Sequence, residues 1–272
     1  MKTLLRLPAT ISRYAGLWCA YIRINWLALM AYNVDFIISN TANLVHNVAQ
    51  ILAVGIIFQH IGSIAGWSFD QVLYLYALAA LGRSLWHLFF VSVLTIGQNV
   101  RTGEFERLLV RPANVLFQLV ANYLDNDDWG EAVIGIVLLG HSVGRLGLID
   151  SPLDILVIAL QVMSAVAIYL ALHLAANTLS FWLVRGRAAE SIVWQLDNFS
   201  RYPLTVYSRP LKALLTWVVP FGFVNFYPAQ VFFGSGAMTW IGWLSPLVGL
   251  LAFALAYRFW EFGLSWYQGT GS

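Results

Sequence analysis

Long apolar stretches are the feature that most restricts how this chain can fold. One of them, "ILVIALQVMSAVAIYLALHLAA" at 155–176, contains no charged residue. The hydrocarbon core of a bilayer is about 30 Å thick, so a helix that crosses it needs roughly 20 mostly apolar residues. Only 10% of the 272 residues are charged, whereas soluble domains average about 25%. The sequence therefore predicts an all-α integral membrane protein.

Charged loops and turn residues divide the chain, treated as one transmembrane domain over residues 1–272, into a surface helix and six spans. Residues 11–33 are rich in aromatic residues but interrupted by Arg13, Arg23 and Asn25, which suits an interfacial amphipathic helix. The charged stretches 98–130 and 185–212 are expected in water and headgroups on the same side of the membrane. The predicted spans cover residues 36–58, 72–97, 132–148, 153–184, 211–230 and 240–260.

The fifth span is expected to be interrupted, because Pro220, Gly222 and Pro228 can each break or kink a helix. The following segment, 226–238, has the composition of a broken or re-entrant stretch. A break that enters from the outer face would serve as an external gate. A simple proline kink without gating is the alternative, and the sequence does not choose between them.

Lysine and arginine predict the orientation, because cytoplasmic loops carry an excess of positive charge. When the N-terminus is placed inside, Arg145 falls near the outer end and Arg83 within a span, which leaves thirteen of the fifteen basic residues on the cytoplasmic side. Both termini are therefore expected in the cytoplasm.

The sequence contains no pattern of a catalytic or cofactor-binding centre. A phosphate-binding loop ends in a glycine-rich turn followed by lysine, and neither Lys2 nor Lys212 follows such a loop. The five histidines are scattered and there is one cysteine, which predicts no metal centre. A net charge of +2 does not indicate nucleic-acid binding. All carboxylates were expected in loops or at span ends, which argues against proton or sodium coupling.

The charged stretch "RTGEFERLLVRP" at 101–112 predicts a short amphipathic helix. Gly103 can start a turn before it and Pro112 can end it. Its predicted apolar face consists of Phe105, Leu108 and Leu109, and its exposed charges are Glu104, Glu106 and Arg107. Such a helix could dock a soluble partner. The alternative is a solvated loop that only connects two spans.

Two motifs resemble a known family. The first is "ERLLVRP" after the second span, and the second is "FSRYPLTVYSRPLKALLTWVVPFGFVNFYPAQ" at 199–230. Together they resemble the permease subunits of type-2 ABC exporters, specifically a bacterial branch with six spans. The resemblance covers nearly the whole chain, and the second motif is the more specific of the two.

The resemblance implies the transmembrane subunit of an ABC exporter in the bacterial inner membrane. Such a subunit forms the translocation path with a second permease, either another copy or a sister chain, and is driven by separate ATPase subunits that hold ATP and Mg. It is not catalytic by itself. The loop 98–130 then contains the family's coupling helix, and 11–33 its interfacial connecting helix. The ATPase-coupling residues implied are Arg101, Gly103, Glu104, Phe105, Glu106, Arg107 and Arg111.

An acidic run before the third span, formed by Asp125, Asp127, Asp128 and Glu131, lies outside the pattern that carries the resemblance. We interpret it as local decoration.

A stripe of polar side chains runs along the first span, within about a 120° arc of the helix. It consists of Asn40, Asn43, His46, Asn47 and Gln50. Lipid offers these groups no partners, so the stripe must face protein or water. In one interpretation the amides join helices, each contact contributing about 0.6 to 2 kcal/mol. In the other they line a water-accessible cleft between two permeases. We expect the first span to border the partner permease and the export path.

Arg83 and His87 lie four residues apart in the second span, so they share one helical face. They could bind an anionic headgroup or substrate. The alternative is a buried pair that is hydrogen-bonded to neighbouring helices.

Two other classes of function were compared with the exporter. A membrane-embedded assembly protein could use the same charged loop to recruit a soluble partner without any transport. An intramembrane enzyme acting on lipids would need histidines and acids clustered at one depth, which the scattered histidines do not supply.

Overall fold

The computed structural model describes residues 7–31, 33–125, 127–183, 187–234 and 236–267, and these are almost entirely helical. The long helices are α1 (Leu7–Ala31), α2 (Asn33–His60), α3 (Phe69–Phe90), α7 (Trp129–Leu146), α8 (Pro152–Thr178) and α13 (Ser245–Trp266). The shorter ones are α4 (Ile96–Thr102), α5 (Phe105–Leu109), α6 (Val115–Asn122), α9 (Arg187–Asp197), α10 (Arg209–Ala213), α11 (Phe226–Phe233) and α12 (Ala237–Trp243).

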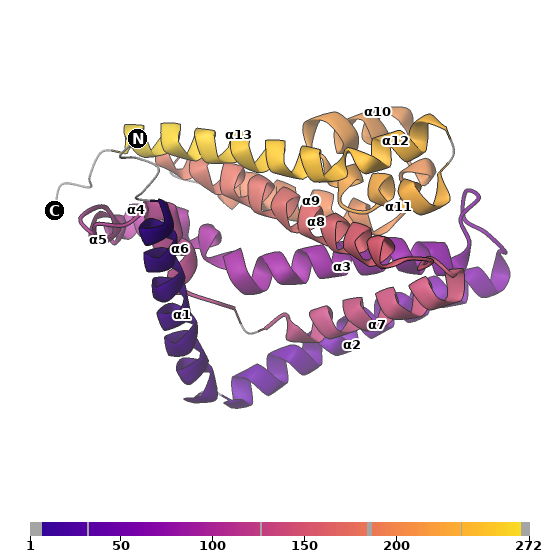
Figure 1. The fold of residues 1–272 in the computed structure, drawn as a ribbon, viewed down its shortest axis with the longest axis horizontal. Coiled ribbons are helices and arrows are strands. Elements are labelled where there is room, and N and C mark those ends of the chain that lie inside the picture. The colour runs from indigo at the N-terminus through magenta and orange to yellow at the C-terminus, as the bar shows by residue number, and fades with distance from the viewer. Residues whose placement is uncertain (1–6, 32, 126, 184–186, 235, 268–272) are drawn as a thin grey trace.

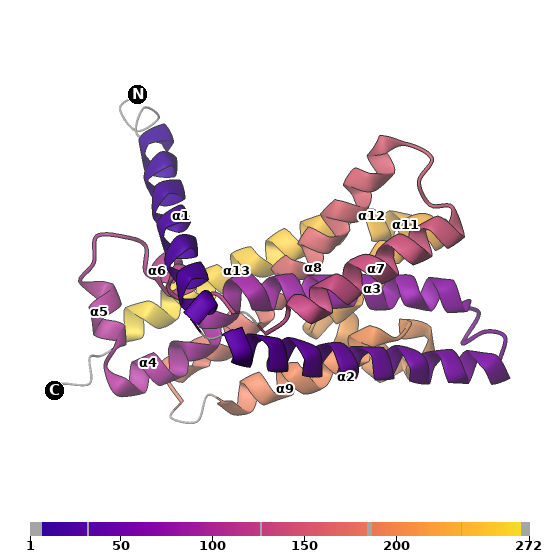
Figure 2. The same ribbon diagram turned by 90° about the horizontal axis from the view of Figure 1, so that it is seen from below.

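The bundle has two distinct ends (Figure 1). The α2–α3 turn, the α7–α8 turn and the short helices α10 to α12 lie at one end, and α4, α5 and the C-terminal end of α13 lie at the other. The helix α1 crosses the common direction of α2, α3, α8 and α13 in both views (Figures 1 and 2). This orientation is the one that an interfacial helix would have beside membrane-crossing helices.

Four helical segments in the described part of the chain are long and apolar enough to cross a membrane. They are Phe36–His60, Phe69–Thr102, Pro152–Phe181 and Ser245–Trp266. The first three coincide with the predicted spans 36–58, 72–97 and 153–184. The last begins later than the predicted 240–260, because α12 ends at Trp243 and a new helix starts at Ser245. By length and composition these helices indicate a multi-pass membrane protein, with fewer long apolar helices in the described residues than the six spans predicted.

The predicted span 132–148 corresponds to α7, which is only 18 residues long. The predicted span 211–230 forms no single helix. It contains α10, a π-helical turn at Leu214–Val218, a short 3₁₀ turn at Phe221–Phe223 and the start of α11. The interruption expected at Pro220 is confirmed, because proline has no N–H to continue the helical bonding.

The stretch 185–212 was expected at the membrane surface, and this is wrong for the second half of α9 and the turn after it. Val193, Asp197 and Ser200 are buried. They pack against α3 and α8, and the side chain of Asp197 bonds to Arg83. A carboxylate in this position can leave water because an arginine on α3 compensates its charge.

The core is centred on α3, whose residues from Val72 to Leu88 are mostly buried between α7 and α8. Small residues allow these helices to approach closely, as is common in membrane bundles. A Cβ added at Gly82 would lie 2.5 Å from the Cβ of Ala165 on α8, and one at Gly249 would lie 2.9 Å from the carbonyl oxygen of Ser164.

Gly82→Ala is therefore expected to lower the free energy of unfolding by about 1–3 kcal/mol, the usual cost of overpacking a tight core. The change can be measured by denaturant titration of the purified protein in detergent. Gly140→Ala is the matched control, because Gly140 lies in α7 with no heavy atom within 4 Å of the added Cβ. If both variants were equally stable, the close α3–α8 contact would be wrong.

Candidate functional site

The charged loop after α3 forms the short helix that the sequence predicted. The preceding α4 ends at Gly103, whose φ of 74° places it in the left-handed region that glycine adopts without strain. Helix α5 then runs from Phe105 to Leu109 and ends before Pro112. Phe105 is fully buried and Leu108 is 9% exposed, but Leu109 is 43% exposed. The prediction that Leu109 shares the buried face was therefore wrong.

The ring of Phe105 packs α5 against the rest of the protein. Its centroid lies 5.1 Å from that of Tyr267, 5.5 Å from Phe181 and 5.9 Å from Trp260. Phe181 lies in the 3₁₀ turn that follows α8, Trp260 lies in α13, and Tyr267 directly follows α13. Packed aromatic side chains thus connect α5 to the C-terminal ends of two long helices.

Most of the charged side chains of the loop are exposed. Arg101, Glu104, Arg107 and Arg111 are exposed and Glu106 is half-buried. None of the five forms an ion pair or a side-chain hydrogen bond with a described residue. Beside α5 lies a cleft of about 350 Å³, which Glu104, Arg107 and Arg111 help to line. The charged surface is therefore free to contact another molecule.

Helix α1 holds the other end of the loop. The guanidinium of Arg13 donates to the carbonyl oxygen of Pro112 at 2.9 Å, and the backbone N–H of Asn114 donates to the hydroxyl of Tyr14 at 3.0 Å. The rings of Tyr14 and Phe117 meet edge to face at 4.7 Å. The loop is thereby fixed between α1 and α13.

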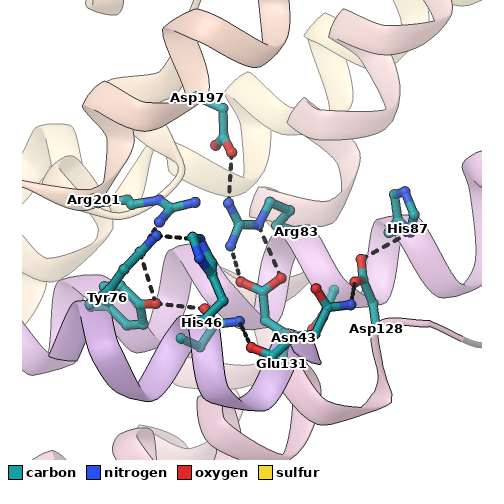
Figure 3. Close-up of polar contacts among 12 residues, drawn as sticks. Asn43, His46, Tyr76, Arg83, His87, Asp128, Glu131, Asp197 and Arg201 are labelled. Carbon is teal, nitrogen blue, oxygen red and sulfur yellow. Dashed lines mark hydrogen bonds and ion pairs between the residues drawn. The ribbon is translucent and has the colours of Figure 1, made fainter. Parts of the chain in front are cut away.

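The polar stripe of α2 faces α7 and α3 of the same chain (Figure 3). The Asn40 side chain accepts from the backbone N–H of Gly130 at 2.9 Å. Asn43 donates to the carboxylate of Asp128 at 3.1 Å. Asn47 is buried and accepts from the Tyr76 hydroxyl at 2.7 Å. These are the contacts expected of amides that join helices.

Further along α2, the two remaining members of the stripe differ in their surroundings. His46 is exposed, with its Nε2 atom 2.6 Å from the Gln50 side chain. The Gln50 carbonyl oxygen accepts from Tyr76 at 3.4 Å and from Arg201. Of the stripe, His46 is therefore the member that remains open to the surroundings.

Arg83 lies at the centre of an ion network that joins four helices (Figure 3). Its guanidinium binds the Glu131 carboxylate of α7 through two nitrogens and donates to Asp197 of α9 at 3.1 Å. The Tyr169 hydroxyl of α8 donates to the second oxygen of Asp197 at 2.6 Å. The structure thus corresponds to the interpretation in which Arg83 is buried and bonded to its neighbours.

His87, one turn further along α3, lies within ion-pair distance of two other carboxylates. Its Nδ1 atom lies 2.8 Å from Asp125 and 2.9 Å from Asp128. Burial and the nearby Asp125 carboxylate raise the pKa of Asp127 in the same loop. The acidic run is therefore the partner of the basic residues of α3, and its interpretation as decoration was wrong.

Sequence reasoning missed this pairing and the burial of Glu131 and Asp197, which are 4% and 2% exposed. The sequence did contain a signal for this pairing. Arg83 and His87 lie in an apolar helix, where basic side chains need carboxylate partners. The nearest acidic run along the chain supplies three of the four partners.

Comparison with known proteins defines the class to which this arrangement belongs. A family model described as "ABC-2 family transporter protein" matches residues 44–271, which include the loop, the ion network and the broken stretch. The chain belongs to this family and is a type-2 ABC permease. No curated protein and no solved structure matches the chain significantly.

Proposed function

We propose that this chain is the transmembrane subunit of an ATP-driven exporter. In this proposal the loop around α5 is the docking site for separate ATPase subunits, which hold ATP and Mg. The permease forms the translocation path with a second permease chain, which is another copy or a sister. Closure of the ATPase pair then moves the permease halves between inward-open and outward-open states.

One observation carries the proposal beyond family membership. The loop that the resemblance assigns to ATPase coupling is anchored at Phe105 and presents its charges outward without partners in the described chain. A loop that only connected two spans would have no need of a buried aromatic anchor. A docking helix needs both features, because it must bind a partner and transmit its movement.

The membrane arrangement follows from the same proposal. The four long helices cross the bilayer, α7 crosses as a shorter helix, and the stretch from α9 to α11 makes a broken sixth crossing. Helix α1 lies along the cytoplasmic surface of the bacterial inner membrane, and both termini are cytoplasmic. The export path runs along α2, on the side where His46 is exposed.

Simultaneous replacement of Glu104, Glu106 and Arg107 by alanine tests the proposal. We expect ATP-dependent transport in reconstituted vesicles to fall by about tenfold or more, a range typical of coupling between sites. The fold should be retained, because none of the three side chains bonds to a described residue. Co-purification with the ATPase, ATP hydrolysis and substrate movement should be measured on the same preparation.

The double replacement of Arg258 and Glu261 by alanine is the control, since it removes an exposed ion pair of α13. Normal transport by the triple variant would show that α5 is not the coupling helix. If the chain bound a soluble partner but no ATP-dependent movement occurred, it would be an assembly protein instead.

A further inference from the structure

Arg201 is an arginine inside the bundle without a carboxylate partner. It ends the 3₁₀ turn Asn198–Arg201 after α9 and lies between α2 and α3 (Figure 3). Among the described residues its guanidinium bonds only to the Gln50 carbonyl, and its buried Nε–H has no hydrogen-bond partner. A buried N–H of a charged group that lacks a hydrogen-bond partner is costly, so this Nε–H within a membrane bundle indicates a binding role.

The acidic residues of the neighbourhood are already engaged. Glu131 and Asp197 both bind Arg83, and neither is within ion-pair distance of Arg201. The Tyr76 hydroxyl, which lies beside the same cleft, donates to Asn47 at 2.7 Å and to Gln50 at 3.4 Å. A guanidinium has five N–H donors in a planar fork, so most of those of Arg201 remain available to a ligand.

A cleft opens beside this guanidinium. It has a volume of about 290 Å³ and extends between α2 and α3. Its walls are mostly apolar and include Ile51, Val54, Val72 and Leu73, whereas Arg201 lies with Gln50 and Tyr76 at its polar part. This volume is near the lower limit of about 300 Å³ that is usual for small-molecule sites, which are apolar with a few polar groups.

The cleft also lies at membrane depth. Gln50 is ten residues before the end of α2 at His60, which corresponds to about 15 Å along the helix. This places the polar part of the cleft near the middle of the proposed bilayer, with the apolar walls extending from it toward the α2–α3 turn.

We infer that this cleft binds an amphipathic anion, with its oxyanion head on the Arg201 guanidinium and its hydrocarbon chain along α2 and α3. Carboxylate and phosphate oxygens match the planar donor fork of arginine. The apolar walls take a chain that enters sideways from the lipid. The further assignment of this anion as a transported substrate rests on the proposed function.

Photolabelling of the full-length chain in nanodiscs tests the site. The probes are diazirine-bearing dodecanoate and dodecyl phosphate, compared with the matching alcohol and amine. We expect the two anions to label residues 50–54 and 72–76, and the alcohol and amine to label them weakly. Arg201→Gln should reduce anion labelling by about tenfold or more, as expected for loss of a charged hydrogen bond.

Arg201→Lys keeps the charge and should retain part of the labelling, so it separates binding from folding. Arg209→Gln, which removes an exposed arginine of α10, is the matched control and should label normally. The inference is overturned if the alcohol labels the cleft as strongly as the anions, or if Arg201→Gln leaves labelling unchanged.

Two further arms identify the source of the anion. Competition by phosphatidylglycerol in the nanodisc, with no ATP-dependent loss of the probe, would identify a lipid headgroup as the occupant. Faster ATP hydrolysis with dodecanoate in the complex with the ATPase, together with ATP-dependent release, would identify a substrate. If the cleft is labelled as expected but no ATPase associates with the chain, the site stands and the proposed exporter function fails.

Discussion

Replacing Arg83 with glutamine is expected to lower the free energy of unfolding by about 3–5 kcal/mol, the cost of leaving a buried carboxylate without its partner. Both Glu131 and Asp197 depend on this guanidinium and are almost completely buried. Glutamine can replace a hydrogen bond but supplies no charge. The measurement is denaturant titration in detergent, followed by circular dichroism.

Two controls separate the ion network from a general effect of losing an arginine. Arg258 is 82% exposed in its ion pair with Glu261, so Arg258→Gln should cost less than about 1 kcal/mol. A triple variant, in which Arg83→Gln is combined with Glu131→Gln and Asp197→Asn, removes all three charges and should recover much of the lost stability. If Arg83→Gln alone were as stable as the wild type, the buried network would be wrong.

Trp86→Ala is expected to have an effect of similar size, about 3–5 kcal/mol, because it removes a large buried ring. Trp86 is completely buried, and its ring stacks on His173 of α8 at 3.8 Å with an interplanar angle of 13°. It also meets the ring of Trp194 on α9 at 5.8 Å. The variant therefore opens a cavity at the junction of α3, α8 and α9.

Trp217→Ala provides the matched comparison. Trp217 is 81% exposed on the π-helical turn, so its replacement should change the unfolding free energy by no more than about 0.5 kcal/mol. Trp86→Phe keeps most of the volume and loses a buried Nε1–H that has no hydrogen-bond partner, so it should be milder than alanine. Equal losses for Trp86→Ala and Trp217→Ala would contradict the packing described.

Both large effects fall on α3, and this has a functional consequence. Arg83, Trp86 and His87 lie in the second half of α3, which is followed by a short 3₁₀ turn, α4 and then α5. In the proposed exporter, a movement at the ATPase surface would therefore reach the ion network along α3 and through the aromatic contacts of Phe105.

Local signals in the sequence were sufficient for the longest apolar helices, α2, α3 and α8. In a bilayer an α-helix bonds each backbone N–H and C=O within its own segment, so uninterrupted apolar runs of about 20 residues favour membrane-crossing helices. The glycine before α5 and the proline after it were likewise predicted, because a left-handed turn and a missing N–H are properties of single residues. Membership of the permease family also followed from contiguous motifs.

Only the tertiary structure decided which polar groups meet. Glu131 lies 48 positions after Arg83 in the sequence, and Asp197 lies 114 positions after it. No periodicity in the sequence encodes such distant pairs. The same holds for the amides of α2, which turn toward α7 and α3, and for the second half of α9, which was expected in water but is buried. The physical reason is that a charged side chain buried away from water must pair with a group that lies close to it in the folded protein. Which groups lie close is decided by the packing of the whole bundle.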